Sequence, residues 1–130
     1  MPDIPWKTFS PPALDKEYLV MASSLPLRTR WRVPQFLMLT MAVRKQLATA
    51  PGLVGYGLRA DILGGRFWTL SAWESEEALG SFARALPHSD IMRKLRPHMG
   101  PTQFVTWQAT GTALPVTWET ALAKLADARP

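Results

Sequence analysis

No cysteine occurs among the 130 residues of this sequence, and histidine and tyrosine occur only twice each. Without thiols, disulfide bridges, thiolate metal sites, iron–sulfur clusters and cysteine nucleophiles are all excluded. Long hydrophobic runs are also missing, since no window approaches the roughly 18 apolar residues of a membrane span, and residues 1–6 lack the regions of a secretory signal. We therefore expect a cytoplasmic protein with no membrane partner.

Several catalytic motifs are absent as well. The chain has no Gly-x-Ser-x-Gly elbow, no His-Glu-x-x-His helix and no acidic cluster, so triad hydrolysis and metal-assisted hydrolysis have no support. Glycines at 52, 55 and 57 are not followed by a helix that could hold phosphate. We expect neither a metal nor a dinucleotide.

The net charge of +5 makes nucleic acid a hypothesis to consider. The basic residues form two modest groups instead of a long stripe interleaved with aromatics: Arg28, Arg30, Arg32 and Arg93, Lys94, Arg96. A nucleic-acid footprint usually has such a stripe or a known reading motif. We therefore expect no nucleic-acid partner.

The residues that are present predict one globular domain, because 47% are hydrophobic and 19% are charged. Four prolines fall within residues 1–16, where they fix φ and remove backbone donors. This pattern predicts a proline-rich N-terminal arm over 1–16, without regular structure, and a single domain over 17–130.

Hydrophobic periodicity predicts strands and helices in the order β, α, β, β, α, β and then a terminal helix. Their expected ranges are 17–25, 31–50, 52–60, 66–73, 75–86 with a continuation at 89–95 beyond Pro87, 102–110 and 116–128. Ser75 suits the N-cap of the second helix. The order predicts an α+β, ferredoxin-like βαββαβ fold with a four-stranded antiparallel sheet and an extra C-terminal helix.

This fold places both helices on one face of the sheet and leaves the other face bare. The strands are apolar on both sides, as in 66–73, where Trp68 and Leu70 alternate with Phe67. A second copy laid against the bare face would form a dimeric α+β barrel, so we expect a homodimer. The alternative is that the N-terminal arm and the terminal helix cover this face within one chain.

One stretch resembles a known family. The residues of 67–79, which read FWTLSAWESEEAL, resemble together with Phe82 and Pro87-His88 the strand-to-helix signature of the antibiotic biosynthesis monooxygenase-like proteins of the dimeric α+β barrel superfamily. The resemblance covers roughly 18–110 in element order. It implies the fold described above and relatives that include cofactor-free oxygenases of polycyclic aromatics, haem-degrading enzymes, carotenoid oxygenases and isomerases.

The resemblance also bears on haem. In haem-degrading relatives the iron-ligating histidine lies about ten residues beyond an aromatic residue of the second helix, a position that corresponds to Met92 when counted from Phe82. His88 comes four residues earlier, which is one helical turn. We therefore expect no cofactor, with haem as the alternative if the break at Pro87 shifts the register.

His88 is the candidate catalytic residue, because histidine can act as acid or base near neutral pH and this one lies at a helix break. Its alternative role is to cap a helix or face solvent. We predict that the following side chains bind substrate: Trp68, Tyr56, Trp107, Phe82 and Arg66. Aromatic rings suit a flat substrate and arginine suits a carboxylate or enolate, although strand aromatics are also ordinary core residues.

These observations favour a small-molecule enzyme, a monooxygenase-like oxidoreductase acting on a hydrophobic, aromatic or polyketide-like substrate in a cleft between sheet and helices. Deprotonation by His88 would yield an electron-rich carbanion that reduces oxygen without a metal. The alternatives are a non-catalytic protein that binds a small apolar ligand, a haem-binding protein, and an isomerase or cyclase of the same fold.

Overall fold

The computed structural model describes residues 3–86 and 88–127. Its elements follow the chain in the order that the periodicity predicts, with one additional strand at the start. They are β1 (Asp3–Thr8), β2 (Glu17–Pro26), η1 (Arg30–Arg32), α1 (Val33–Leu47), β3 (Leu53–Asp61), β4 (Arg66–Trp73), α2 (Glu76–Arg84), α3 (His88–Leu95), η2 (Arg96–His98), β5 (Gln103–Thr110), η3 (Gly111–Ala113) and α4 (Trp118–Asp127).

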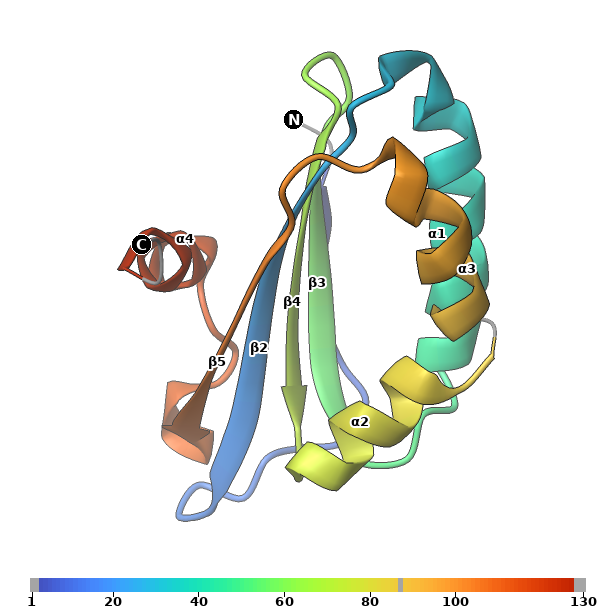
Figure 1. Ribbon diagram of the computed structural model, residues 1–130. Helices are drawn as coiled ribbons and strands as arrows, with labels where there is room; N and C mark the ends of the chain where they lie inside the picture. Colours follow the sequence, from blue (N-terminus) through green and yellow to red (C-terminus); the bar gives the residue numbers. More distant parts are fainter. Residues whose placement is uncertain (1–2, 87, 128–130) are drawn as a thin grey trace.

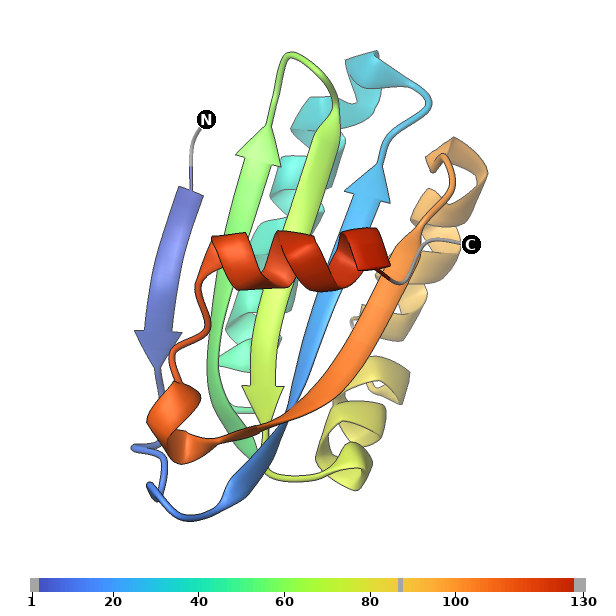
Figure 2. The ribbon, with the colours of Figure 1, turned by 90° about the vertical axis from the view of Figure 1, so that its left-hand side faces the viewer.

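The strands form one antiparallel sheet in the order β1-β3-β4-β2-β5. Helices α1, α2 and α3 cover one face, and α4 crosses the other face (Figures 1 and 2). Strands β2 to β5 with α1 and the α2–α3 pair are the βαββαβ unit, so the predicted ferredoxin-like fold is confirmed. In the described part of the chain, none of the helices has the length and hydropathy of a transmembrane segment.

The N-terminal arm corrects the sequence prediction. We expected no regular structure before residue 17, but β1 pairs with β3, with Ile4 opposite Leu58 and Lys7 opposite Tyr56. Proline is tolerated because β1 is an edge strand and needs donors on one side only. The register shifts between Ile4 and Lys7, where Pro5 stands. The sheet therefore has five strands instead of four.

The helix boundaries follow the local signals in the sequence. Ser75 caps α2 as predicted, because its hydroxyl accepts a hydrogen bond from the Ala78 N–H at 3.1 Å. The second helix is divided as predicted, since α2 ends at Arg84 and α3 begins at His88. Pro87, to which the break was assigned, lies outside the described residues.

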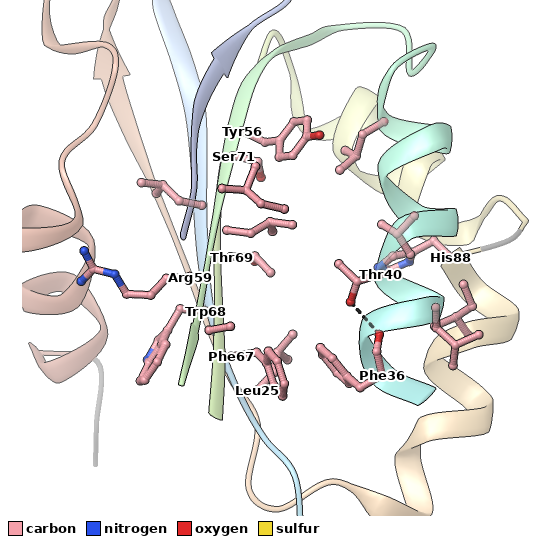
Figure 3. A pocket seen from close by; sticks show the side chains of 18 of the residues that line it. Leu25, Phe36, Thr40, Tyr56, Arg59, Phe67, Trp68, Thr69, Ser71 and His88 are labelled. Atoms are coloured by element: carbon pink, nitrogen blue, oxygen red, sulfur yellow. Dashed lines mark hydrogen bonds between the residues drawn. The ribbon is translucent and has the colours of Figure 1, made fainter. Parts of the chain in front are cut away.

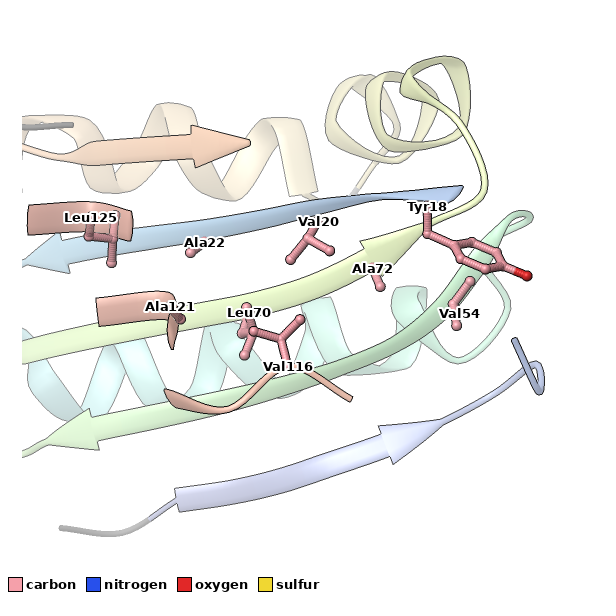
Figure 4. Close-up of a cluster of buried hydrophobic side chains, with 9 residues drawn as sticks. All are labelled: Tyr18, Val20, Ala22, Val54, Leu70, Ala72, Val116, Ala121 and Leu125. Carbon is pink, nitrogen blue, oxygen red and sulfur yellow. The ribbon is translucent and has the colours of Figure 1, made fainter. Parts of the chain in front are cut away.

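The face opposite α1 to α3 holds a hydrophobic core of its own (Figure 4). Alternate residues of the central strands pack there against the C-terminal segment, and the buried members are Tyr18, Val20, Ala22, Val54, Leu70, Ala72, Val116, Ala121 and Leu125. The last three come from α4 and the segment that leads to it. The chain itself thus covers the centre of the face that we expected a second copy to cover, and the homodimer stays a prediction.

Candidate functional site

A cavity of about 340 Å³ lies between the sheet and helices α1, α2 and α3. Its wall is almost entirely apolar, built by alternate residues of β2, β3 and β4 and by the inner face of α1 (Figure 3). The polar side chains that face it are few: Thr40, Tyr56, Thr69, Ser71 and His88. A concave apolar site with few polar groups is the usual form of a small-molecule site.

Three of these polar side chains are bonded within the protein. Thr40 donates to the backbone oxygen of Phe36 at 2.8 Å, and Ser71 accepts from the Trp73 indole at 2.8 Å. The hydroxyl of Thr69 shares a hydrogen bond with that of Ser23. The Thr40 hydroxyl thus donates its proton within the protein, whereas the Ser71 hydroxyl accepts one hydrogen bond and still has its own O–H to donate.

Tyr56 is held differently. The Arg44 Nε donates to the Tyr56 hydroxyl oxygen at 3.2 Å, and the Phe9 ring stacks on the Tyr56 ring at 5.7 Å between centroids. A phenol that accepts one hydrogen bond still has its own O–H to donate. The Tyr56 hydroxyl can therefore donate a hydrogen bond to an oxygen atom of a bound molecule.

His88 is fixed at the junction of α2 and α3. The Gln46 side chain of α1 accepts from the His88 backbone N–H at 2.9 Å and donates to the Phe82 backbone oxygen at 3.0 Å. The imidazole Nδ1 lies 3.1 Å from the Ala83 backbone oxygen, which can only accept. In the neutral ring this contact places the proton on Nδ1 and leaves Nε2 as a base.

The ring of Phe82 packs on both His88 and Trp73, at centroid distances of 4.9 and 5.3 Å. The structure thus brings three of the six predicted site residues, Tyr56, Phe82 and His88, to one cavity.

The other three lie elsewhere. The side chains of Trp68 and Trp107 are on the α4 side of the sheet, where each packs against the second core. Although Trp68 borders the cavity with its backbone, its indole points away from it (Figure 3). Arg66 and Trp68 line a smaller depression near the C-terminal end of α4, with the Arg66 guanidinium 5.6 Å from the Trp68 ring. The predicted grouping of these three with His88 is therefore not found.

The reason is strand alternation. Phe67 and Trp68 are adjacent, so only one of them can face the helices, and both faces of β4 are apolar. Hydrophobicity alone does not identify the side, and here Phe67 faces the helices, where it stacks on Phe36 at 4.0 Å.

Sequence reasoning missed the contribution of α1. Arg44 and Gln46 look like solvent-facing residues of an amphipathic helix, yet each holds a residue of the cavity wall. A long side chain can reach round its own helix, which helical periodicity does not reveal.

The site offers little to a metal. Among residues 3–86 and 88–127, no three His, Asp or Glu side chains are placed to hold a metal ion. For haem, His88 and Met92, which are one helical turn apart on α3, both line the cavity.

Comparisons with known proteins add the following. No protein-family model matches the sequence, and no curated protein is found as a relative. Among solved structures, an antibiotic biosynthesis monooxygenase is similar with a TM-score of 0.64 and 16% identity over 71% of this chain and 98% of that chain. A conserved protein from Methanosarcina mazei has a TM-score of 0.62 and 15% identity over 69% and 90% of the two chains.

A third similar structure is a mutant of SnoaB, a cofactor-independent oxygenase from Streptomyces nogalater. Its TM-score is 0.59 and its identity is 13% over 75% of this chain and 97% of that chain. Identities this low carry no information about the substrate. The chain has the fold of the antibiotic biosynthesis monooxygenase-like proteins, which confirms at the level of the fold the resemblance predicted from residues 67–79.

Proposed function

We propose that this chain is a monooxygenase-like oxidoreductase that binds a hydrophobic, aromatic or polyketide-like molecule in the cavity and needs no cofactor. The observation that carries the proposal is the pairing of a nearly apolar cavity with a histidine whose Nδ1 is held by a carbonyl, which leaves Nε2 available as a base. The similar fold of the cofactor-independent oxygenase SnoaB supports it.

The chemistry needs an acidic C–H. His88 takes one proton from a substrate methylene that is flanked by aromatic rings or a carbonyl, and the carbanion passes electrons to O₂. One oxygen atom becomes a carbonyl on that carbon and the other leaves as water, so that CH₂ and O₂ give C=O and H₂O. The Tyr56 hydroxyl donates to the substrate oxygen on which negative charge develops.

Oxygen uptake with an anthrone, whose methylene is acidic, tests the proposal. We expect wild-type protein dialysed against a chelator to consume one O₂ per anthrone, and His88→Ala to be slower by about 10²–10⁴-fold, as for a lost general base. His98→Ala is the matched control, because His98 is the other histidine and does not line the cavity. Equal turnover by both variants would remove His88 from the chemistry.

One observation favours a second candidate, a protein that binds an apolar ligand and catalyses nothing. Most hydroxyls of the cavity wall are already bonded within the protein. Binding of aromatic ketones without oxygen uptake or rearrangement would support this candidate. A rearranged product without oxygen uptake would indicate an isomerase, and a Soret shift on titration with haemin would indicate a haem protein.

A homodimer and a cytoplasmic location remain predictions. The homodimer was expected from the apolar second face of the sheet, whose centre α4 now covers. Light scattering at micromolar concentration tests it directly, since one chain has a mass of 14.5 kDa.

A further inference from the structure

Three connecting segments meet at one end of the sheet, beyond the C-terminal end of β2 (Figures 1 and 2). They are 27–32, which leads into α1, the β3–β4 turn with the start of β4 at 61–66, and 96–101, which leads into β5. Backbone hydrogen bonds tie them together, from Leu27 N to Gly65 O at 2.7 Å and from Arg28 N to His98 O at 2.7 Å. We call these three segments the basic end.

The basic end carries most of the net charge of the protein. Its sequence contains five arginines, at 28, 30, 32, 66 and 96, and one acidic residue, Asp61. Five positive charges and one negative charge give +4, out of +5 for the whole chain. The remainder of the molecule is therefore almost neutral, and this end attracts anions.

Large apolar side chains are exposed among these arginines. The exposed fractions are 73% for Trp31, 40% for Ile62 and 88% for Leu63. The guanidinium of Arg32 lies 4.5 Å from the Trp31 ring centre. Exposed Trp and Leu beside Arg are typical of protein surfaces that enter the headgroup region of a membrane.

The cavity and the basic end have one exposed residue in common, Ile62 of the β3–β4 turn. Of the side chains that line the cavity in the described part of the chain, Leu37 of α1 and Ile62 of the β3–β4 turn are the most exposed, at 37% and 40%. Ile62 therefore belongs both to the cavity wall and to the exposed apolar side chains of the basic end. An apolar molecule that leaves a surface touched by Ile62 would thus meet a residue of the cavity wall first.

We propose that the basic end docks on an anionic lipid surface, with Trp31, Ile62 and Leu63 in the headgroup layer and the exposed arginines Arg28, Arg66 and Arg96 on lipid phosphates and carboxylates. The proposal replaces the sequence-based expectation of no membrane partner, which rested on the lack of a spanning helix. It goes beyond the proposed function by naming where an apolar substrate is collected. Lipid is favoured over nucleic acid because Ile62 and Leu63 are aliphatic and cannot stack on bases.

Sedimentation with unilamellar vesicles tests the docking without any substrate, so that failure of the proposed enzymatic function does not affect the result. We expect wild-type protein to bind phosphatidylcholine vesicles that contain phosphatidylserine, and to bind pure phosphatidylcholine far more weakly. Each arginine near such a surface contributes about a fivefold change in affinity, so R28E/R96E should bind at least about tenfold more weakly. High salt should weaken binding as well.

The apolar contribution is tested with Trp31→Ser and Leu63→Ser, two exposed positions whose replacement leaves the core intact. Each should reduce vesicle binding severalfold. The matched control is L14S/K16E, which changes an exposed leucine and a lysine in the turn before β2, at the opposite end of the sheet. This control should bind as wild type does.

Three results would overturn the proposal. The first is no binding to the phosphatidylserine vesicles at low salt. The second is an equal loss in L14S/K16E and R28E/R96E, which would indicate a general effect of charge. The third is tighter binding to an oligonucleotide duplex that Leu63→Ser leaves unchanged, which would identify the basic end as a nucleic-acid surface.

Discussion

Single side chains decide what the cavity can bind, and alternation along β4 decides which of them reach it. Val43 lines the cavity from α1, whereas Trp107 packs on the far side of the sheet. Replacement of Val43 by Phe should fill part of the cavity and weaken binding of phenylnaphthylamine, a neutral fluorescent dye, by about tenfold. Trp107→Phe should leave dye binding unchanged, and a similar loss in both variants would place the ligand elsewhere.

A surface carboxylate gives a pH-dependent prediction. The side chain of Asp90 is bonded to Lys94 at 3.2 Å and to Arg93, and these partners lower the pKa of its carboxyl below the ordinary value of 3.8. A carboxyl whose pKa is lower in the folded than in the unfolded protein stabilises the fold while it is ionised. This stability is fully present above the pKa of the unfolded state and is lost as the pH falls through the pKa of the folded state. Asp90→Asn should therefore lower Tm slightly at pH 7 and not at pH 2.

Thermal melts of Asp90→Asn at both pH values check this. The control is Asp127→Asn, because Asp127 has no ion pair in the described part of the chain. A larger Tm loss at pH 2 than at pH 7 would contradict the sign of the argument.

Strand alternation also helps to explain which cavity residues could be predicted from the sequence and which could not. His88 and Tyr56 were singled out by a helix break and by neighbouring glycines, which are local features, and both line the cavity, whereas their roles stay predictions. The side of the sheet that Trp68 and Trp107 face could not, since both faces are apolar and only the tertiary structure distinguishes them. The roles of Arg44 and Gln46 also depend on which strand and helix ends lie beside α1.

Secondary-structure elements show a comparable division. The inner strands were predicted to within one residue at each end and the helices to within three, because periodicity and caps are encoded locally. Strand β1 was missed because Pro2, Pro5 and the prolines at 11 and 12 argue against a strand in isolation. Its hydrogen bonds come from β3, some fifty residues away in the chain, and a local signal does not contain that partner.

Substitution of two glycines by alanine should have opposite effects on stability, because an added Cβ meets backbone at one position and only a flexible side chain at the other. Gly111 begins η3 and donates its N–H to the Lys16 backbone oxygen at 2.9 Å, and a Cβ there would overlap the backbone oxygen of Ala13. Gly111→Ala should lower the free energy of unfolding by about 1–3 kcal/mol, because backbone must move. Gly80 lies inside α2, where a Cβ would meet only the mobile guanidinium of Arg84 at 2.8 Å.

Gly80→Ala should therefore raise the free energy of unfolding by about 0.5–1 kcal/mol through helix propensity. Urea unfolding of both variants checks the pair. If Gly80→Ala lost as much stability as Gly111→Ala, the Arg84 side chain could not move away from the added methyl group. The difference expected between a side-chain contact and a backbone contact would then be wrong.

The oligomeric state of the whole molecule depends on what covers the second face of the sheet. Ala121 of α4 is fully buried against this face, and Ala123 is exposed two residues later on the same helix. Ala121→Asp should detach α4, because an unpaired carboxylate cannot stay in an apolar core. The core residues of β2 and β4 beneath it would become exposed.

A sheet face of that kind associates with another copy. We expect light scattering to give a higher mass for Ala121→Asp than for wild type at the same concentration, and the free energy of unfolding to fall by more than about 2 kcal/mol. Ala123→Asp, the same change on the outer side of α4, should match wild type in both measurements. If the two variants behaved alike, α4 would not lie on the sheet in solution, and the apolar face would again need the second copy that its sequence predicts.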